Sequence, residues 1–242
     1  MCIRDRHKAF GDKRVLRGVN LEVRRGETVV VLGGSGSGKS VLIKHTILLH
    51  RPDAGRVWVD GRDITECAEE ELLETRKKVG MLFQAGALFD SMTVGENVSY
   101  ALREHTDWDE EKITQRVGKV LQLVELDEIE GLMPSDLSGG MRKRVALARA
   151  IALSPRAILY DEPTTGLDPI TANTINHLIR SLQKRLGVTS IVVTHDIHSA
   201  FTVGDRIAFL HEGGIRFDGS VAEAKRTDEP LLRNFLQGGG YG

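Results

Sequence analysis

The fold class of this 242-residue chain is decided by residues 29–40, which read Val29-Val30-Val31-Leu32-Gly33-Gly34-Ser35-Gly36-Ser37-Gly38-Lys39-Ser40. A strand-sized apolar run leads into a glycine-rich segment of the pattern G-x-x-x-x-G-K-[ST]. Glycines let backbone N–H groups close around an anion, and a helix that begins at Lys39 adds its partial positive charge. The Lys39 ammonium can neutralise phosphate oxygens, and the Ser40 hydroxyl can ligate Mg²⁺. The stretch predicts a nucleoside triphosphate site; a flexible Gly/Ser loop is the alternative.

Two further unbroken apolar runs, at 157–160 and 191–193, indicate strands that are buried on both faces. Such strands belong in a sheet that helices cover on each side, usually a parallel sheet. Helices are expected at 39–50 and 171–186. An alternation of apolar and polar residues through 19–23 favours a half-buried antiparallel edge strand. These signals predict an α/β core around the glycine-rich loop.

Helical periodicity replaces the strand signals from residue 86 to 155, as at Ile113, Val117 and Val120. Beyond Arg206 we expect a hairpin over 207–217, then a short helix at 230–236 and a glycine-rich tail. The interpretation is a single domain over 1–242. Its expected parts are a nucleotide-binding core with an antiparallel β subdomain (1–85 and 156–220), a helical subdomain (86–155), and a C-terminal helix and tail (221–242).

Composition narrows the class of protein. A formal net charge of −1 and 40% hydrophobic residues give no bulk attraction to nucleic acid or anionic lipid. Cys2 and Cys67 lack a disulfide or metal spacing, which fits a reducing cytoplasm. No apolar run approaches the roughly 18 residues of a membrane span, so service at a membrane requires a partner. Residues 1–6 resemble neither a signal peptide nor the start of a strand, so we expect an altered natural N-terminus.

Asp161 and Glu162 end the apolar run 157–160. Ligands collect at the carboxyl ends of strands in such sheets. Asp161 is suited to hold Mg²⁺ through water, and Glu162 to accept a proton from an attacking water. The alternative is a solvated strand end that starts a turn at Pro163.

A second anion-binding helix end is predicted at Leu137-Ser138-Gly139-Gly140-Met141, ahead of the helical run 142–153. Ser138 is a good N-cap, and the two glycines leave backbone donors open. An ordinary helix cap is the alternative. The basic run 142–144 is interpreted as a solvated helix face.

Taken together and in this order, these segments resemble the ABC ATPase family, with the P-loop NTPase fold of that family. The resemblance covers nearly the whole chain. It implies Gln84, Glu162 and His195 as catalytic residues, and Asp168 as the D-loop residue that acts across a dimer interface. A simple turn aspartate before Pro169 is the alternative for Asp168, and a satisfied polar residue at a strand end for His195. The implied nucleotide-binding residues are Phe10, Gly33, Gly34, Ser35, Gly36, Ser37, Gly38, Lys39, Ser40 and Val41.

The resemblance also implies ATP and Mg²⁺, the metal held by Ser40, Gln84 and Asp161. Two copies pair head to tail, so that Ser138, Gly139, Gly140 and Met141 of one copy complete the pocket of the other. Met141 and Phe10 depart from the commoner glutamine and tyrosine of the family. Neither change removes a phosphate ligand, and a phenyl ring can still stack on adenine.

Finer features resemble the ATPases of Mla-type, MCE-associated phospholipid transporters. They are the segments 81–94, 102–106, 132–135 and 168–171, together with Met141. This implies a peripheral subunit at the cytoplasmic face of the inner membrane, with a permease, an MCE-type lipid-binding protein, possible binding of a small accessory regulator, and no nucleic acid. Ala87, Leu88 and Phe89 are hypothesised to receive a permease helix, or else to be ordinary core. An importer for another solute and a regulatory ABC ATPase remain open.

Overall fold

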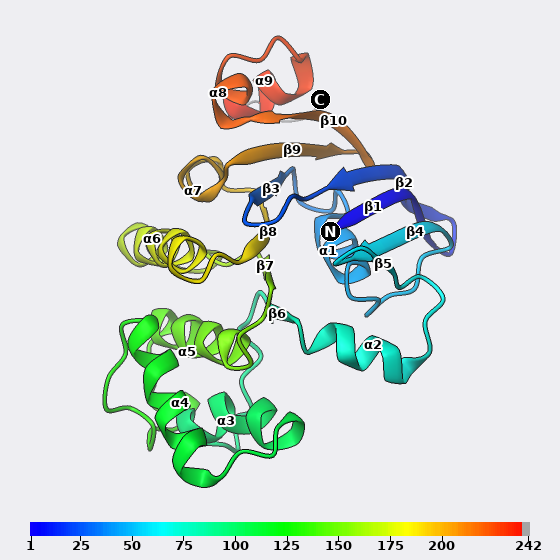
Figure 1. Ribbon diagram of the computed structural model, residues 1–242. Helices are drawn as coiled ribbons and strands as arrows, with labels where there is room; N and C mark the ends of the chain where they lie inside the picture. Colours follow the sequence, from blue (N-terminus) through cyan, green and yellow to red (C-terminus); the bar gives the residue numbers. More distant parts are fainter. Residues whose placement is uncertain (239–242) are drawn as a thin grey trace. The chain divides into compact units, whose positions relative to one another are not determined.

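The computed structural model describes residues 1–238 and consists of two compact units (Figure 1). The first unit comprises Met1–Arg76 and Thr189–Gly242, and the second comprises Lys77–Val188. The tail residues 239–242 lie outside the described residues. Among the described helices none is long and apolar enough to cross a membrane.

The first unit contains a four-stranded antiparallel sheet in the order β2-β1-β4-β5. The strands are β1 (Cys2–Phe10), β2 (Lys13–Glu22), β4 (Ala54–Val59) and β5 (Arg62–Asp63). Leu16, Val19 and Leu21 are buried, which confirms the predicted antiparallel edge strand. The expectation that residues 1–6 do not start a strand is wrong, because Ile3 and Arg6 both face the interior across an irregular register.

A parallel group of strands forms the other part of the first unit. Strand β3 (Thr28–Leu32) pairs in parallel with β8 (Thr189–Thr194) and with β9 (Arg206–His211). Strand β10 (Gly214–Ser220) returns antiparallel to β9, as the predicted hairpin requires. Every residue of β3 and β8 is buried, which explains their unbroken apolar runs.

The helices of the first unit are short. They are α1 (Lys39–His45), α2 (Glu69–Arg76), α7 (Ile197–Val203), α8 (Val221–Lys225) and α9 (Pro230–Leu236). Helix α9 matches the prediction. Helix α1 ends before the expected residue 50, because the Thr46 hydroxyl donates to the Ile43 carbonyl at 2.6 Å and Leu48 takes a positive φ of 50°. A left-handed residue cannot continue the helix.

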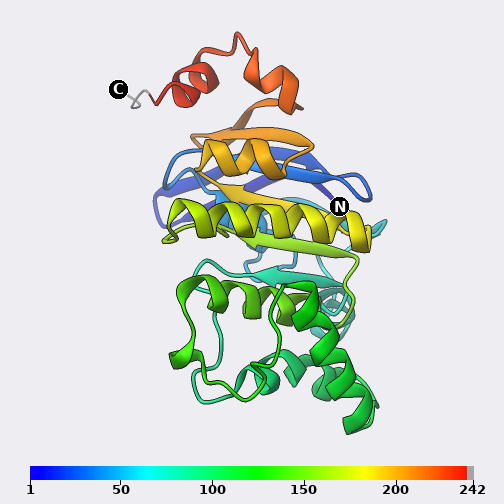
Figure 2. The same ribbon diagram turned by 90° about the vertical axis from the view of Figure 1, so that its left-hand side faces the viewer.

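The second unit contains two parallel strands, β6 (Val79–Leu82) and β7 (Ala157–Asp161), which pair with each other. The chain between them is helical, as predicted: α3 (Val94–His105), α4 (Glu110–Leu123), the 3₁₀ turn η1 (Pro134–Asp136) and α5 (Gly139–Ile151). Helix α6 (Pro169–Leu186) follows and is seen along its length in Figure 2. This unit, Lys77–Val188, includes more of the chain than the helical subdomain expected at 86–155. The expected division of the chain into subdomains stays a prediction.

Local sequence signals fix where the helices of the second unit begin. Thr93 and Glu96 form a capping box at the start of α3, and the side chains of Asp109 and Ser138 cap α4 and α5. The predicted apolar stripe of α4 is buried at Ile113 and the positions that follow it in helical spacing. The caps and the stripe together specify a packed helical segment.

Candidate functional site

The predicted phosphate loop connects β3 to α1 in the first unit. Gly38 is the N-cap of α1 with a left-handed φ of 102°, and no side chain caps the helix. A Cβ at Gly33 would lie 2.3 Å from the Leu210 carbonyl oxygen, and one at Gly38 would lie 3.0 Å from the Val15 carbonyl oxygen. Only glycine fits this close approach of backbone to backbone. The glycines therefore let the loop turn tightly into the start of α1, the helix end at which anions bind.

The polar groups inside this loop fit a phosphate. Lys39 is 5% exposed, and its Nζ donates to the carbonyls of Gly33 at 2.9 Å and Gly34 at 3.0 Å. The Ser37 hydroxyl is buried without a hydrogen-bond partner in the described residues. A buried hydroxyl without a partner is costly unless a ligand supplies one. The loop thus has a cation, a hydroxyl donor and a helix N-terminus at one place.

Phe10, the predicted adenine-stacking residue, ends β1 and is 49% exposed. Its ring lies in a pocket of about 320 Å³ that is also lined by Val15, Val41 and residues of the phosphate loop. The Lys8 ammonium lies 5.2 Å from the ring centroid. The structure therefore brings the aromatic residue and the phosphate loop to the same pocket.

His195 follows β8 directly and is exposed. Because Leu32 of β3 is paired with Thr194 of β8, Gly33 and His195 follow two adjacent parallel strands at the same end. Ligands bind at the carboxyl ends of such strands. The first unit places His195 at the sheet edge where the phosphate loop begins.

The carboxylate pair lies in the second unit, at the end of β7. Asp161 is 4% exposed and Glu162 is 7% exposed, so the alternative of a solvated strand end is wrong. Glu162 has a positive φ of 48°, an unfavourable backbone conformation for a residue with a Cβ. The Thr165 hydroxyl donates to Oε2 of Glu162 at 3.1 Å. The hydroxyl of Thr165 thus helps to orient the Glu162 carboxylate.

Gln84 lies in the tight turn that follows β6, where the Gly86 amide donates to the Phe83 carbonyl at 2.8 Å. Its side chain is exposed. The backbone carbonyl oxygen of Gln84, not its side-chain amide, accepts a hydrogen bond from the ammonium of Lys143 in α5. The structure therefore connects the predicted glutamine to the helix that follows the second glycine-rich segment.

The expectation of a solvated helix face over 142–144 is wrong at Lys143, a residue that the sequence interpretation misses. It is 6% exposed. The available signal was its spacing, since it lies three residues after Gly140 and four before Leu147, both of them buried in α5. Residues at these spacings share one helix face.

The predicted signature segment caps α5. The Ser138 hydroxyl accepts a hydrogen bond from the Met141 amide at 3.2 Å, and Ser138 and Gly139 are exposed. Gly140 is buried, and a Cβ there would lie 2.5 Å from Cγ2 of Thr171 in α6. One glycine therefore leaves the helix start open, and the next lets two helices approach.

Asp168 caps α6, since one carboxylate oxygen accepts from the amides of Ile170 and Thr171 at 3.0 Å each. Hydrogen bonds from Thr171 and Ile170 outweigh desolvation and lower the pKa of Asp168. The local role is that of a helix cap. A role across a dimer interface stays a prediction.

Comparison with known proteins agrees with the family that the sequence motifs resemble. The family described as ABC transporter matches residues 16–165. The probable ribonucleotide transport ATP-binding protein mkl of Mycobacterium leprae is 43% identical over 231 residues, covering 96% of this chain and 67% of that protein. The intermembrane phospholipid transport system ATP-binding protein MlaF of Haemophilus influenzae is 40% identical over 228 residues, covering 94% and 86%. The chain spans about two thirds of the length of the mycobacterial relatives.

A solved structure has the same fold. It is the dimeric, post-hydrolysis structure of the ATP-binding cassette MJ0796 bound to ADP and Pi. The TM-score is 0.84 at 34% sequence identity, and the match covers 91% of this chain and 98% of that one.

Proposed function

Since the chain belongs to the ABC transporter family as an ATPase subunit, we propose that its ATP hydrolysis drives phospholipid transport through a membrane permease. The observation that carries the nucleotide part is the pocket in which Phe10 and the phosphate loop meet. Stacking on the ring and backbone donors around the phosphates are the two contacts that a purine nucleotide needs. The buried Ser37 hydroxyl supports a phosphate as the occupant.

The proposed roles follow the chemistry of each side chain. Glu162 removes a proton from the attacking water, and the hydroxyl of Thr165 keeps its carboxylate in one orientation. Lys39 and His195 contact phosphate oxygens. The amides of residues 33–41 are proposed to bind the nucleotide, and Gln84 to lie near its γ-phosphate. The proposed metal ligands are Ser40, Gln84 and Asp161.

Mg²⁺ is proposed as the cofactor, and it would neutralise charge that develops on the phosphates. Within residues 1–238 no group of three or more His, Cys, Asp or Glu side chains could hold a metal by itself. This fits Mg²⁺, which keeps several waters and binds through one or two protein oxygens plus substrate phosphates. The Ser40 hydroxyl and the buried Asp161 are donors of that kind.

A second copy of the chain is the first proposed partner. The Ser138 hydroxyl caps helix α5 by accepting from the Met141 amide, and Ser138 and Gly139 are exposed at the helix start. We propose that Ser138, Gly139, Gly140 and Met141 bind the ATP held by the other copy. Asp168 would act in the same interface. The dimeric cassette that this chain resembles supports the proposal.

The permease is proposed to dock on the segment after Gln84. Phe89 and Tyr100 are 43% and 42% exposed, and their ring centroids lie 5.2 Å apart. Phe89 is therefore not ordinary core. The buried Asn97 side chain accepts from the Phe89 amide at 2.8 Å and donates to the Phe89 carbonyl at 3.0 Å. An exposed aromatic pair on such a fixed loop suits the apolar face of a partner helix.

Phospholipid is the proposed cargo because the relative with 86% of its length covered, MlaF, is named for it and because the segments 81–94 and 168–171 resemble that group. The name of mkl leaves an importer for another solute as the alternative. We propose peripheral attachment at the cytoplasmic face of the inner membrane, with an MCE-type protein and a small accessory regulator as further partners.

Isolation of the complex from its native membrane tests these proposals. We expect a permease and an MCE-type protein to copurify, with phospholipid identified by mass spectrometry. A photo-crosslinker at Phe89 should reach the permease, whereas one at the exposed Leu186 should not. A complex that contains a different solute receptor would contradict the lipid proposal, and a chain that isolates without any permease would contradict transport.

A further inference from the structure

The four cations of helix α5 all donate to backbone carbonyls, and two of them, Lys143 and Arg149, reach the turn that contains Gln84. The Lys143 ammonium donates to the carbonyl of Gln84 and, at 3.5 Å, to the carbonyl of Glu162. The Arg149 guanidinium donates to the carbonyls of Gly86 at 2.9 Å and Ala87 at 2.7 Å. One helix therefore holds both the turn that contains Gln84 and the residue proposed as the general base.

The burial of Lys143 is hard to explain by stability alone. Desolvation lowers the pKa of Lys143, although the charges of Asp161 and Glu162 act in the opposite direction. An uncharged side chain of the same length would avoid the cost of burying an ammonium. Hydrogen bonds to the backbone carbonyls of Gln84 and Glu162 offset part of that cost. Both residues have a proposed role in hydrolysis.

The backbone of Glu162 needs external support. Its φ of 48° lies in the left-handed region, which is unfavourable for a residue with a Cβ unless the surroundings hold it. A hydrogen bond to its carbonyl from Lys143 is one such restraint. The same ammonium restrains the turn at Gln84, so the two residues share one anchor.

We propose that Lys143 is a positioning residue for ATP hydrolysis, which fixes the backbone of Gln84 and Glu162 against the helix that begins with Gly139. The proposal rests on the proposed function. Because α5 also presents the signature segment at its N-terminus, a ligand that contacts Ser138 or Gly139 acts on the same helix that holds Gln84 and Glu162. Lys143 thus couples the signature segment, which is proposed to bind the ATP of the other copy, to Gln84 and Glu162.

The test compares Lys143→Met, which keeps length and removes charge, with Lys143→Arg, which keeps the charge. Lys119→Met is the matched control at an exposed lysine of α4. We measure ATP affinity, kcat and the melting temperature of the full chain in its complex. For Lys143→Met we expect kcat to fall about 10- to 100-fold, because a displaced catalytic group has an effect of that size. ATP affinity stays within about twofold because Lys39 and Phe10 are untouched.

Rescue separates positioning from a structural role. Lys143→Arg should recover part of kcat, and Lys143→Met should melt at or above the wild-type temperature because it removes a buried charge. A Lys143→Met protein that melts lower but keeps kcat within about twofold of wild type overturns the proposal. If Lys143→Met does not fold, Lys143→Gln is measured in its place, and a kcat within about twofold of wild type again overturns the proposal. Absence of hydrolysis in the wild-type complex would instead refute the proposed function.

Discussion

Gly139 and Gly140 are adjacent residues that meet different surroundings. A Cβ at Gly140 would lie 2.5 Å from Cγ2 of Thr171, whereas one at Gly139 would lie 3.6 Å from Cδ2 of Leu167. The first distance requires the Thr171 side chain or one of the two helices to shift, and the second is ordinary contact. We predict that Gly140→Ala lowers the free energy of unfolding by about 1–3 kcal/mol, as overpacking does. Gly139→Ala should change it by less than about 0.5 kcal/mol. Urea unfolding measures both.

A second substitution checks the cause. Thr171→Ser removes the methyl group that the new Cβ would meet, so Gly140→Ala combined with Thr171→Ser should recover most of the lost stability. If the double variant is as unstable as Gly140→Ala alone, the contact with Thr171 is not the reason.

The residues of the phosphate loop and the signature segment could be predicted because their chemistry depends on short spacings in the sequence. Lys143 could not be predicted in this way, since a basic run usually indicates a solvated face and only the positions of Gly140 and Leu147 place it inside. The positive φ of Glu162 was also beyond prediction. It depends on the restraints around β7, which are not local.

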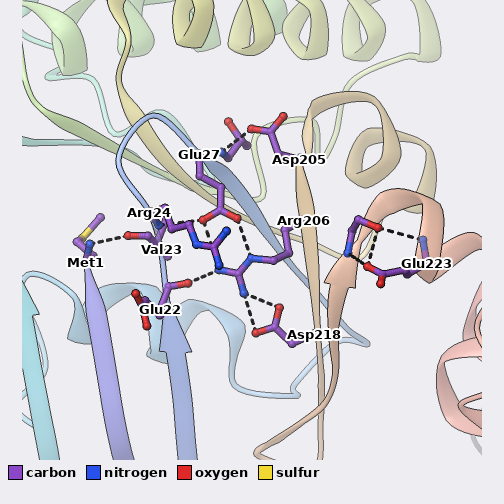
Figure 3. A network of polar contacts seen from close by, with 11 residues as sticks. Met1, Glu22, Val23, Arg24, Glu27, Asp205, Arg206, Asp218 and Glu223 are labelled. Carbon is purple, nitrogen blue, oxygen red and sulfur yellow. Dashed lines mark hydrogen bonds and ion pairs between the residues drawn. The ribbon is translucent and has the colours of Figure 1, made fainter.

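At the scale of elements, Arg206 connects four segments of the first unit (Figure 3). From the start of β9 its guanidinium binds Glu27 at 2.7 Å and Asp218 of β10 at 2.5 and 2.7 Å, and it donates to the Glu22 carbonyl at the end of β2. The side chains of Arg206 and Glu27 are only 22% and 14% exposed. Such a partly buried network is worth more than a surface pair.

We predict that Arg206→Met lowers the free energy of unfolding by about 1–3 kcal/mol, because Glu27 loses its partner in a partly buried place. Arg233→Met is the control, since its contact with Asp228 is 3.9 Å long and both side chains are exposed. That change should be below about 0.5 kcal/mol. If both variants lose the same free energy of unfolding, the Arg206 network stabilises the fold no more than an exposed ion pair does.

The same network predicts a pH dependence. Partial burial raises the pKa of Glu27, but the hydrogen bonds from Arg206 and the Arg24 amide outweigh it and lower the pKa below its ordinary value of 4.5. A carboxylate with a lowered folded pKa stabilises the fold above that ordinary value and loses this effect as the pH falls below it. The stability difference between wild type and Arg206→Met should therefore shrink below about pH 4.5. Urea titrations from about pH 7 to about pH 3 measure it, because the loss continues until the pH falls through the lowered pKa of Glu27.

Elements with a strong apolar pattern could be predicted from the sequence, and elements without one could not. Strands β3, β7 and β8 are apolar and fully buried, so their sequence shows it. Helix α2 was missed because Leu72 and Thr75 are its only buried residues among a run of glutamates. Without a wide apolar stripe, packing rather than pattern determines such a helix.

At the scale of the whole molecule, each unit contains a part of the predicted site. The first unit has the phosphate loop, Phe10 and His195, and the second has the carboxylate pair, Gln84 and the signature segment. These parts could be predicted from the sequence because each is a short motif of neighbouring residues. Their joint action, and the pairing of two copies, depends on nucleotide and therefore stays a proposal to be tested with nucleotide present.

The decisive comparison is between Lys39→Ala and Glu162→Gln. Lys39→Ala removes the buried cation of the phosphate loop and should lose ATP binding and ATP-dependent pairing together. Glu162→Gln keeps that loop, so it should bind ATP normally but hydrolyse it at least about 100-fold more slowly. With the γ-phosphate retained, the paired form should accumulate in light scattering.

Glu128→Gln is the matched control, because Glu128 is also left-handed, with a φ of 58°, but is exposed and lies outside the motifs. It should hydrolyse ATP as wild type does. If Glu162→Gln keeps normal turnover, Glu162 is not the general base. If it stops turnover and yet remains monomeric with ATP, hydrolysis and pairing are separate events, and each copy then binds ATP without Ser138 of the other.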